Sequence, residues 1–287
     1  MKHALWVFAL LAAAGCANPG RAPGFDAAHP PALQEVHFDS HGDRLNGIVY
    51  VANGPGPHPT VILLHGFPGN ERNLDLAQSM RADGWNVLFF HYRGAWGSEG
   101  TYSFTHVIED VAAAADFLRA NAGPLRTDAS RIILVGHSMG GFASLMAAAR
   151  DDRIACTAAI TPADLDALAG MLAAQPELAR GWSSYSGTLT MLHGFSWQVA
   201  LDEIMANRTA FDLRALAPQL RGKSVLIVAA DQDTDIPADA IVQPLIDAYE
   251  ADPAIRTTGL TLSGDHSFSW SREELISTVR QWARGCR

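Results

Sequence analysis

The 287-residue sequence has few charged side chains and no excess of positive ones. Charged residues make up 18% of the chain, below the roughly 25% that is usual in soluble proteins. Lys and Arg number 21 against 30 Asp and Glu, so the formal net charge is -9 at pH 7. A nucleic-acid partner requires a basic surface that holds the phosphate backbone. This charge balance therefore argues against nucleic-acid binding.

The sequence also lacks the common motifs for metals and nucleotide cofactors. No group of Cys, His and carboxylate residues has the spacing of a zinc site, and no glycine-rich phosphate loop follows a candidate strand. We therefore predict that the protein uses no metal and no organic cofactor. Hydrophobic residues account for 48% of the chain, which is enough for one large core, and the oligomeric state stays open.

The N-terminus carries an apolar stretch that is too short to cross a membrane as a helix. Positive charge at Lys2 precedes this stretch at 4–14, as in an export signal. Residues 11–16, LAAAGC, resemble a bacterial lipobox, which implies that Cys16 is lipidated and tethers the protein to a membrane. The alternative is an ordinary signal peptide. Both interpretations of residues 1–16 predict export, to the periplasm or as a membrane-anchored lipoprotein rather than as a freely secreted protein.

The segment after the export signal predicts a linker. Residues 17–32 are rich in Pro, Gly and Ala without a period, which favours a flexible tether before a folded domain at 33–287. Beyond Cys16 the chain has two further cysteines, Cys156 in a candidate strand and Cys286 next to the last residue. The sequence permits a disulfide between them but does not predict one.

Hydrophobic periodicity indicates an α/β fold. Alternating segments at 34–41 and 45–52 flank Gly42-Asp43 and predict an antiparallel hairpin. Continuous apolar runs then alternate with helical patterns, which is typical of strands buried on both faces of a sheet. The predicted strands lie at 61–64, 87–90, 132–135, 154–160, 225–229 and 260–262, and the predicted helices at 71–83, 105–121, 139–150, 238–251 and 272–283. This order predicts a mostly parallel, doubly wound sheet with an antiparallel edge.

The connection at about 163–222 is too long for an ordinary crossover between strands. We predict that it is a helical lid inserted into the domain. It contains five aromatic residues that either face a site below the lid or pack the lid onto the sheet: Trp182, Tyr185, Phe195, Trp197 and Phe211.

A candidate nucleophile lies in the pentapeptide GHSMG at 136–140. It follows the apolar run 132–135 and precedes a segment of Ala, Leu and Met that favours a helix. A sharp turn from strand to helix presents Ser138 at the end of the strand, and the flanking glycines avoid clashes there. A serine hydroxyl needs a neighbouring base, and imidazole has a suitable pKa.

With these features the chain resembles the α/β-hydrolase superfamily from about residue 33 to the C-terminus, because serine, acid and histidine occur in that order, each just after a predicted strand. The resemblance implies an α/β-hydrolase fold and identifies His266 as the catalytic base. Residues 230–237, ADQDTDIP, resemble the family segment G-x-x-D-x-x-V-P, which aligns the acid with Asp233. Asp235 is the second candidate, and Asp231 is expected to cap or to face solvent.

The resemblance also implies two backbone donors for an oxyanion. One is the N–H of Met139, directly after the nucleophile. The other is the N–H of Phe67, because residues 65–70, HGFPGN, resemble the H-G-x-x-G loop of the superfamily. We assign His65 and His137 structural roles rather than proton transfer.

The segment 91–100 resembles the Y-R-G-x-G-x-S loop of peptidase-like members, including relatives of prolyl oligopeptidase and serine aminopeptidases. Within it, Arg93 is expected to brace loops rather than to bind substrate. The leading hypothesis is a serine hydrolase that cleaves an ester of a small acyl substrate. A peptidase acting on short peptides, a thioesterase or an acyltransferase is the alternative within this chemistry. A lipoprotein that binds a ligand without catalysis is the alternative from another class.

Overall fold

The computed structural model describes residues 24–286. The predicted export signal at 1–16, with Cys16, lies outside the described residues, as does the predicted tether up to residue 23. From Gly24 onward the tether segment contacts the body of the protein. The Gly54 N–H donates to the His29 carbonyl oxygen at 2.9 Å, and the Arg126 guanidinium donates to the Pro30 carbonyl oxygen at 2.8 Å.

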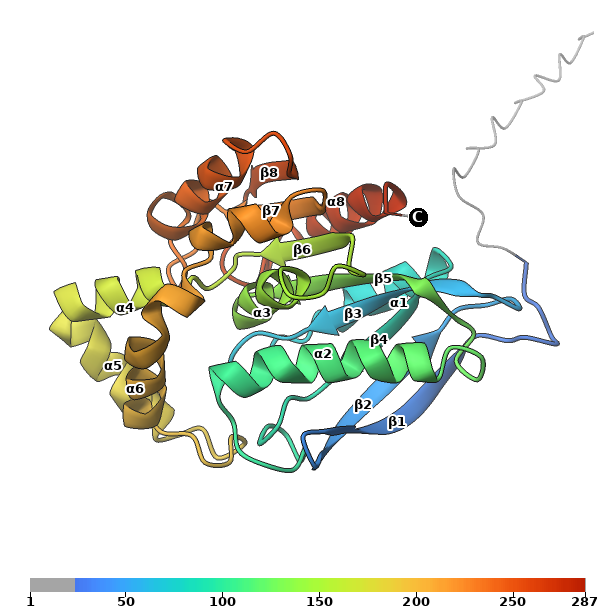
Figure 1. Ribbon diagram of the computed structural model, residues 1–287, viewed down its shortest axis with the longest axis horizontal. Coiled ribbons are helices and arrows are strands. Elements are labelled where there is room, and N and C mark those ends of the chain that lie inside the picture. The colour runs from blue at the N-terminus through green and yellow to red at the C-terminus, as the bar shows by residue number, and fades with distance from the viewer. Residues whose placement is uncertain (1–23, 287) are drawn as a thin grey trace, which may run out of the picture.

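Eight strands form one sheet in the order β1-β2-β4-β3-β5-β6-β7-β8 (Figure 1). β2 pairs antiparallel with both β1 and β4, and all other pairs are parallel. The predicted fold class, a mostly parallel sheet with an N-terminal antiparallel hairpin, is therefore confirmed. The strands are β1 Ala32–Ser40, β2 Asp43–Val51, β3 His58–Leu64, β4 Asn86–Phe90, β5 Thr127–His137, β6 Cys156–Ile160, β7 Ser224–Ala230 and β8 Arg256–Leu262.

A two-residue turn closes the N-terminal hairpin. Ser40 pairs with Asp43, and the residues between them, His41 and Gly42, have φ angles of 55° and 91°. Positive φ at both positions matches the right-handed twist of the flanking strands. The predicted Gly42-Asp43 turn thus includes His41, one residue earlier than the sequence indicated.

Helices cover both faces of the sheet. The side chains of β3 alternate between the two faces, with Ile62 and Leu64 in one apolar cluster and Val61 and Leu63 in the other. The first cluster includes residues of α2, α3 and α7, and the second those of α1 and α8. These helices are α1 Leu74–Ala82, α2 Phe104–Ala120, α3 Met139–Ala148, α7 Gln243–Glu250 and α8 Arg272–Arg284, and a π-helical turn at Ala238–Val242 precedes α7.

The long connection between β6 and β7 is helical. Figure 1 shows α4, α5 and α6 grouped at the end of the sheet away from the C-terminus. Asp164 and Ser196 cap α4 and α6, because their side chains accept from the N–H groups of Ala167 and Val199. The elements of this helical insertion are α4 Leu165–Ala174, α5 Pro176–Ser186, α6 Trp197–Asn207 and two 3-10 helices, Arg208–Phe211 and Arg214–Leu220.

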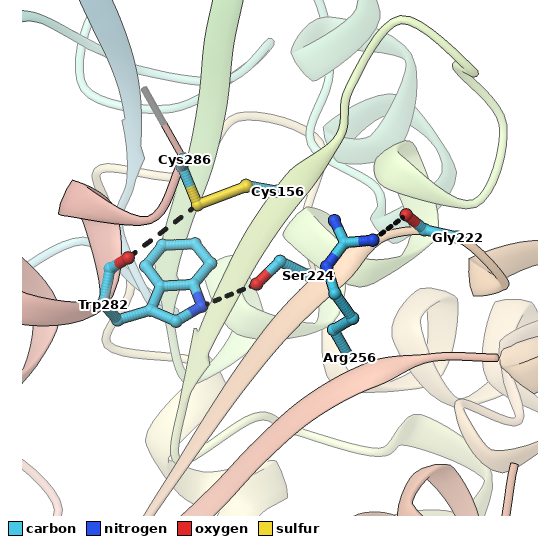
Figure 2. Close-up of a disulfide and its surroundings, with 6 residues drawn as sticks. All are labelled: Cys156, Gly222, Ser224, Arg256, Trp282 and Cys286. Atoms are coloured by element: carbon cyan, nitrogen blue, oxygen red, sulfur yellow. Dashed lines mark hydrogen bonds between the residues drawn. A yellow bond between two sulfur atoms is a disulfide. The ribbon is translucent and has the colours of Figure 1, made fainter. Parts of the chain in front are cut away.

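A disulfide joins Cys156 of β6 to Cys286 after α8, with Cα atoms 6.2 Å apart (Figure 2). Beside it, the indole N–H of Trp282 donates to the hydroxyl oxygen of Ser224 at 3.1 Å. The bond therefore fixes the C-terminal end of α8 to the sheet, a pairing that the sequence left open. Across residues 24–286 we find no helix with both the length and the apolar character needed to cross a membrane.

Candidate active site

Ser138 occupies a strained turn between β5 and α3. Its φ and ψ angles are 57° and -120°, a region that residues with a side chain rarely adopt. The neighbouring glycines make the turn feasible. A Cβ on Gly136 would lie 1.9 Å from the Gly140 carbonyl oxygen, and one on Gly140 would lie 2.2 Å from the Leu64 carbonyl oxygen. The GHSMG sequence therefore folds as the sharp elbow that its pattern predicts.

His266 and Asp233 lie together beyond the ends of β8 and β7. The distance between His266 Nδ1 and Asp233 Oδ2 is 2.7 Å, and the Asp233 side chain is fully buried. The second carboxylate oxygen accepts the backbone N–H groups of Asp235 at 2.9 Å and Ile236 at 2.8 Å. Because an ionised carboxylate only accepts hydrogen bonds, this contact places a proton on His266 Nδ1 and leaves Nε2 free.

The other two aspartates of the segment have different surroundings. Asp235 is exposed, and its carboxylate lies within 4.8 Å of the nearest ligand atoms of Asp233 and His266. Asp231 accepts the N–H of Gly264 at 2.9 Å and joins the two loops that carry the acid and the histidine. The geometry thus pairs His266 with Asp233. Within residues 24–286, Asp233, Asp235 and His266 are also the group whose spacing would allow a metal ion.

His137 contacts the loop that carries His266. Its Nε2 lies 2.7 Å from the His266 carbonyl oxygen, so Nε2 carries a proton and donates it. Burial lowers the pKa of His137 to about 3, and the nearby His266 adds to this effect. His137 is therefore neutral at pH 7 and acts as a structural donor, as the sequence predicts.

The two predicted oxyanion donors flank Ser138. Met139 is the first residue of α3, so its N–H has no acceptor within the helix. Phe67 follows Gly66, where an added Cβ would lie 2.9 Å from the Cβ of Ser138. Within the described part of the chain, the Phe67 N–H donates to no protein acceptor. Among the described residues, both N–H groups are thus without a protein acceptor, and both residues line the same cavity as Ser138.

Ser138 and His266 open into one cavity of about 180 Å³ between the sheet and the helical insertion. The walls are mainly apolar and come from α4, α5 and α6 as well as from Phe67 in the loop after β3. The residues that line the cavity are Phe67, Phe104, Ser138, Met139, Ala163, Leu165, Leu168, Met171, Leu172, Leu178, Trp182, Ser186, Phe195, Trp197, Ala200, Ile204, Thr234, Asp235, Ile236 and His266.

The five aromatic residues of the insertion separate into two groups. Trp182, Phe195 and Trp197 line the cavity. Phe211 instead packs against Phe142 of α3, with ring centroids 5.3 Å apart. Tyr185 is 40% exposed and does not line the cavity. The sequence singled out the aromatic residues but missed the aliphatic wall of α4, for which the helical spacing of Leu165, Leu168 and Leu172 was the available signal.

Arg93 braces the loop after β4 against α2, in line with the predicted bracing role. Its Nε donates to Asp110 at 2.6 Å, its backbone N–H donates to the same carboxylate at 2.7 Å, and its guanidinium also pairs with Glu109. The Arg93 side chain is 5% exposed and does not line the cavity. It therefore has no direct access to a substrate there.

Comparison with known proteins identifies relatives. A sequence model described as the alpha/beta hydrolase family matches residues 61–278. The quorum-quenching protein AidA of Acinetobacter baumannii is 29% identical over 139 residues, which are 46% of this chain and 45% of that protein. Esterase EstD of Thermotoga maritima is 29% identical over 127 residues, which are 40% of this chain and 29% of that protein. The matched segment thus spans less than half of these relatives.

Solved structures match over most of the chain. Est1E from Butyrivibrio proteoclasticus has a TM-score of 0.62 and 21% identity, with 88% of this chain and 98% of that chain covered. The esterase Pf2001 of Pyrococcus furiosus has a TM-score of 0.63 and 18% identity, with 93% of this chain and 98% of that chain covered. At these identities the likeness establishes a shared fold.

Proposed function

Because the chain belongs to the alpha/beta hydrolase family, we propose that it is a serine hydrolase that cleaves esters through an acyl-enzyme. The hydrogen bond between Asp233 and His266, at the cavity into which Ser138 opens, is the observation that carries this proposal. It orients the imidazole and leaves Nε2 as the base. The esterase names of EstD and Pf2001 support the choice of an ester substrate.

The reaction proceeds in two halves. Ser138 Oγ attacks the carbonyl carbon of the ester while His266 Nε2 takes the hydroxyl proton and then passes it to the leaving alcohol. Water next attacks the acyl carbonyl carbon while His266 Nε2 accepts a proton from it. The bond to Ser138 Oγ then breaks, His266 returns the proton to Oγ, and the acid is released. Asp233 keeps the proton on Nδ1 and stabilises the imidazolium in both halves.

The backbone stabilises the negative charge that develops on the carbonyl oxygen. The N–H groups of Phe67 and Met139 donate to this oxyanion. A single donor of this kind contributes a factor of roughly 10² to 10³ in kcat. The positive φ of Ser138 places the serine at the sharp turn before α3, next to the Met139 N–H.

The cavity walls favour an apolar acyl group of modest size. Leucine, methionine and aromatic side chains form most of the surface around Ser138. The volume of about 180 Å³ favours a short or branched chain over a long fatty acid. The alternative of a peptidase rests on the loop at 91–100, but its Arg93 is buried against Asp110 and offers no charge to a peptide terminus.

A p-nitrophenyl ester series from acetate to a long acyl chain tests the proposal. We expect hydrolysis to peak at short to medium chains and Ser138→Ala to lose at least about 10³-fold in kcat. Full activity in Ser138→Ala would refute the proposed nucleophile. If esters fail, aminoacyl-nitroanilides and acyl thioesters test the peptidase and thioesterase alternatives. A fluorophosphonate probe separates an enzyme from a protein that only binds a ligand, because labelling requires an activated serine.

We further propose that the protein is exported and that Cys16 tethers it to a membrane. The disulfide between Cys156 and Cys286 supports a location in an oxidising compartment. Radiolabelled palmitate should enter the protein expressed in a bacterium, and Cys16→Ser should lose both the label and membrane association. Unlabelled but exported protein would favour the ordinary signal peptide.

A further inference from the structure

The peptide bond between Gly66 and Phe67 links the Gly66 carbonyl group, which a hydrogen bond holds in place, to the Phe67 N–H group, a predicted oxyanion donor. The carbonyl oxygen of Gly66 accepts a hydrogen bond from His65 Nδ1 at 2.7 Å. This peptide bond is trans, so its C=O and N–H groups point in opposite directions. The His65 contact on one side therefore fixes the direction of the Phe67 N–H on the other.

The Gly66 carbonyl fixes the tautomer of His65, and His91 contacts the other nitrogen of the His65 ring. Because a carbonyl oxygen only accepts, His65 carries its proton on Nδ1, and its Nε2 is an acceptor in the neutral ring. The His91 Nδ1 lies 3.3 Å from this Nε2 and donates to it. Burial lowers the pKa of His65 to about 4 and that of His91 to about 3, so both rings are neutral at pH 7. The donors thus run in one direction, from His91 through His65 to the Gly66 carbonyl.

Trp96 holds the next part of the same loop. Its indole N–H donates to the Pro68 carbonyl oxygen at 2.7 Å. The ring packs so closely on Gly69, whose φ is 102°, that an added Cβ would lie 2.5 Å from the indole nitrogen. The Arg72 guanidinium lies 4.5 Å from the centroid of the Trp96 ring, and its Nε donates to the Gly69 carbonyl oxygen at 3.1 Å.

We propose that His91 and Trp96 are positioning residues that hold the loop at 66–69 with the Phe67 N–H facing the substrate carbonyl. Neither side chain lines the cavity, so both act through the backbone of this loop. Their ring centroids lie 6.0 Å apart with an angle of 28° between the planes, so the two side chains pack against each other. The proposal rests on the proposed hydrolase function and adds two residues from the segment 91–100 to it.

Variants of the whole protein test the proposal. His91→Leu removes the donor to His65, whereas His91→Asn keeps an N–H group close to the position of Nδ1. Trp96→Phe removes the indole donor and keeps an aromatic ring. Trp282→Phe is the matched control, because it removes another partly buried indole donor, which lies at the disulfide and not at the loop (Figure 2). We expect His91→Leu and Trp96→Phe to lower kcat about 10- to 100-fold with KM within about twofold, since one intact oxyanion donor remains. His91→Asn should recover most of the loss, and Trp282→Phe should show none.

The second readout is the preference for an ester over its thionoester, in which sulfur replaces the carbonyl oxygen. Sulfur accepts hydrogen bonds weakly, so this preference reports the alignment of the oxyanion donors. We expect the preference to fall about 10-fold in Trp96→Phe and to stay unchanged in Trp282→Phe. A lower kcat with an unchanged preference in Trp96→Phe, or an unchanged kcat, would overturn the positioning role. If His91→Leu does not fold, Trp96→Phe and His91→Asn still decide. A failure of the proposed serine hydrolase function is detected separately, because hydrolysis would then persist in Ser138→Ala.

Discussion

The imidazole rings of His137 and His266 lie against each other, with centroids 4.7 Å apart, and His137 Nε2 donates to the His266 carbonyl oxygen at 2.7 Å. His137 directly precedes Ser138 in the chain. This hydrogen bond therefore joins the elbow that carries the proposed nucleophile to the loop that carries the proposed base, although 129 residues separate the two histidines.

We expect His137→Leu to lower kcat/KM about 10-fold or more, because a displaced His266 backbone misaligns the imidazole, and small misplacements are costly in catalysis. His137→Gln keeps an N–H donor near the position of Nε2 and should recover most of the activity. Steady-state kinetics with a p-nitrophenyl ester measures both. Equal losses in the two variants would show that the hydrogen bond is not the cause.

Substitution of the two neighbouring aspartates should have different effects. Asp233→Asn removes the charge beside His266 and allows the wrong tautomer, so kcat should fall by about 10⁴-fold, as in related arrangements. Asp235→Asn should leave hydrolysis of a neutral ester within about twofold. It should instead reduce, by about fivefold, the preference for cationic over anionic leaving groups, because the Asp235 carboxylate borders the cavity. A large loss for neutral esters in Asp235→Asn would reverse this assignment.

The buried neutral histidines should make stability depend on pH. His65, His91 and His137 have pKa values lowered to about 4, about 3 and about 3, so below pH 6.5 they take up protons on unfolding. Their contribution is complete above about pH 6.5 and is lost as the pH falls through their lowered pKa values. Three protons correspond to about 3.5 kcal/mol per pH unit near pH 5.5. Urea unfolding at pH 7.5, 6.5 and 5.5 measures this, and His137→Gln should reduce the slope by about a third.

Removing the disulfide should destabilise the protein. The bond closes a loop with a sequence separation of 130 residues, and its loss is expected to cost about 2 to 5 kcal/mol in the free energy of unfolding. Thermal unfolding of Cys286→Ser measures the effect. A reducing agent should lower the melting temperature of the unmodified protein and leave Cys286→Ser unchanged. An equal response of both proteins to the reducing agent would argue against the disulfide as its target.

Most strands could be predicted from the sequence because both faces of the central sheet are buried. The exact ends of several helices and strands could not be predicted from the sequence. β8 begins at Arg256, four residues before the predicted strand, because an edge strand carries polar residues and its pairing is set by β7. α1 begins at Leu74 rather than at 71, because Asn73 adopts a left-handed conformation with φ 53°. The predicted helix at 238–251 changes from a π-helical turn to α7 next to Pro244, which lacks an N–H donor.

The residues of the site likewise include some that the sequence could locate and some contacts that it could not predict. Ser138 and the proposed oxyanion loop at 65–70 could be located because short motifs encode their backbone conformations. Asp233 and Asp235 are two residues apart and chemically equivalent, so the family pattern could only favour Asp233, and the position of His266 in the structure distinguishes them. The contact between His65 and His91, like the disulfide, depends on the tertiary arrangement of segments that carry no pairing signal in the sequence.

The disulfide also determines the outcome of proteolytic cleavage of this protein. The covalent loop between Cys156 and Cys286 contains the helical insertion, Asp233 and His266, while Ser138 precedes it in the chain. A single cut in an exposed part of the insertion therefore leaves both fragments in one molecule. The proposed base and its acid stay covalently attached to the strand beside the nucleophile even after the chain has been nicked.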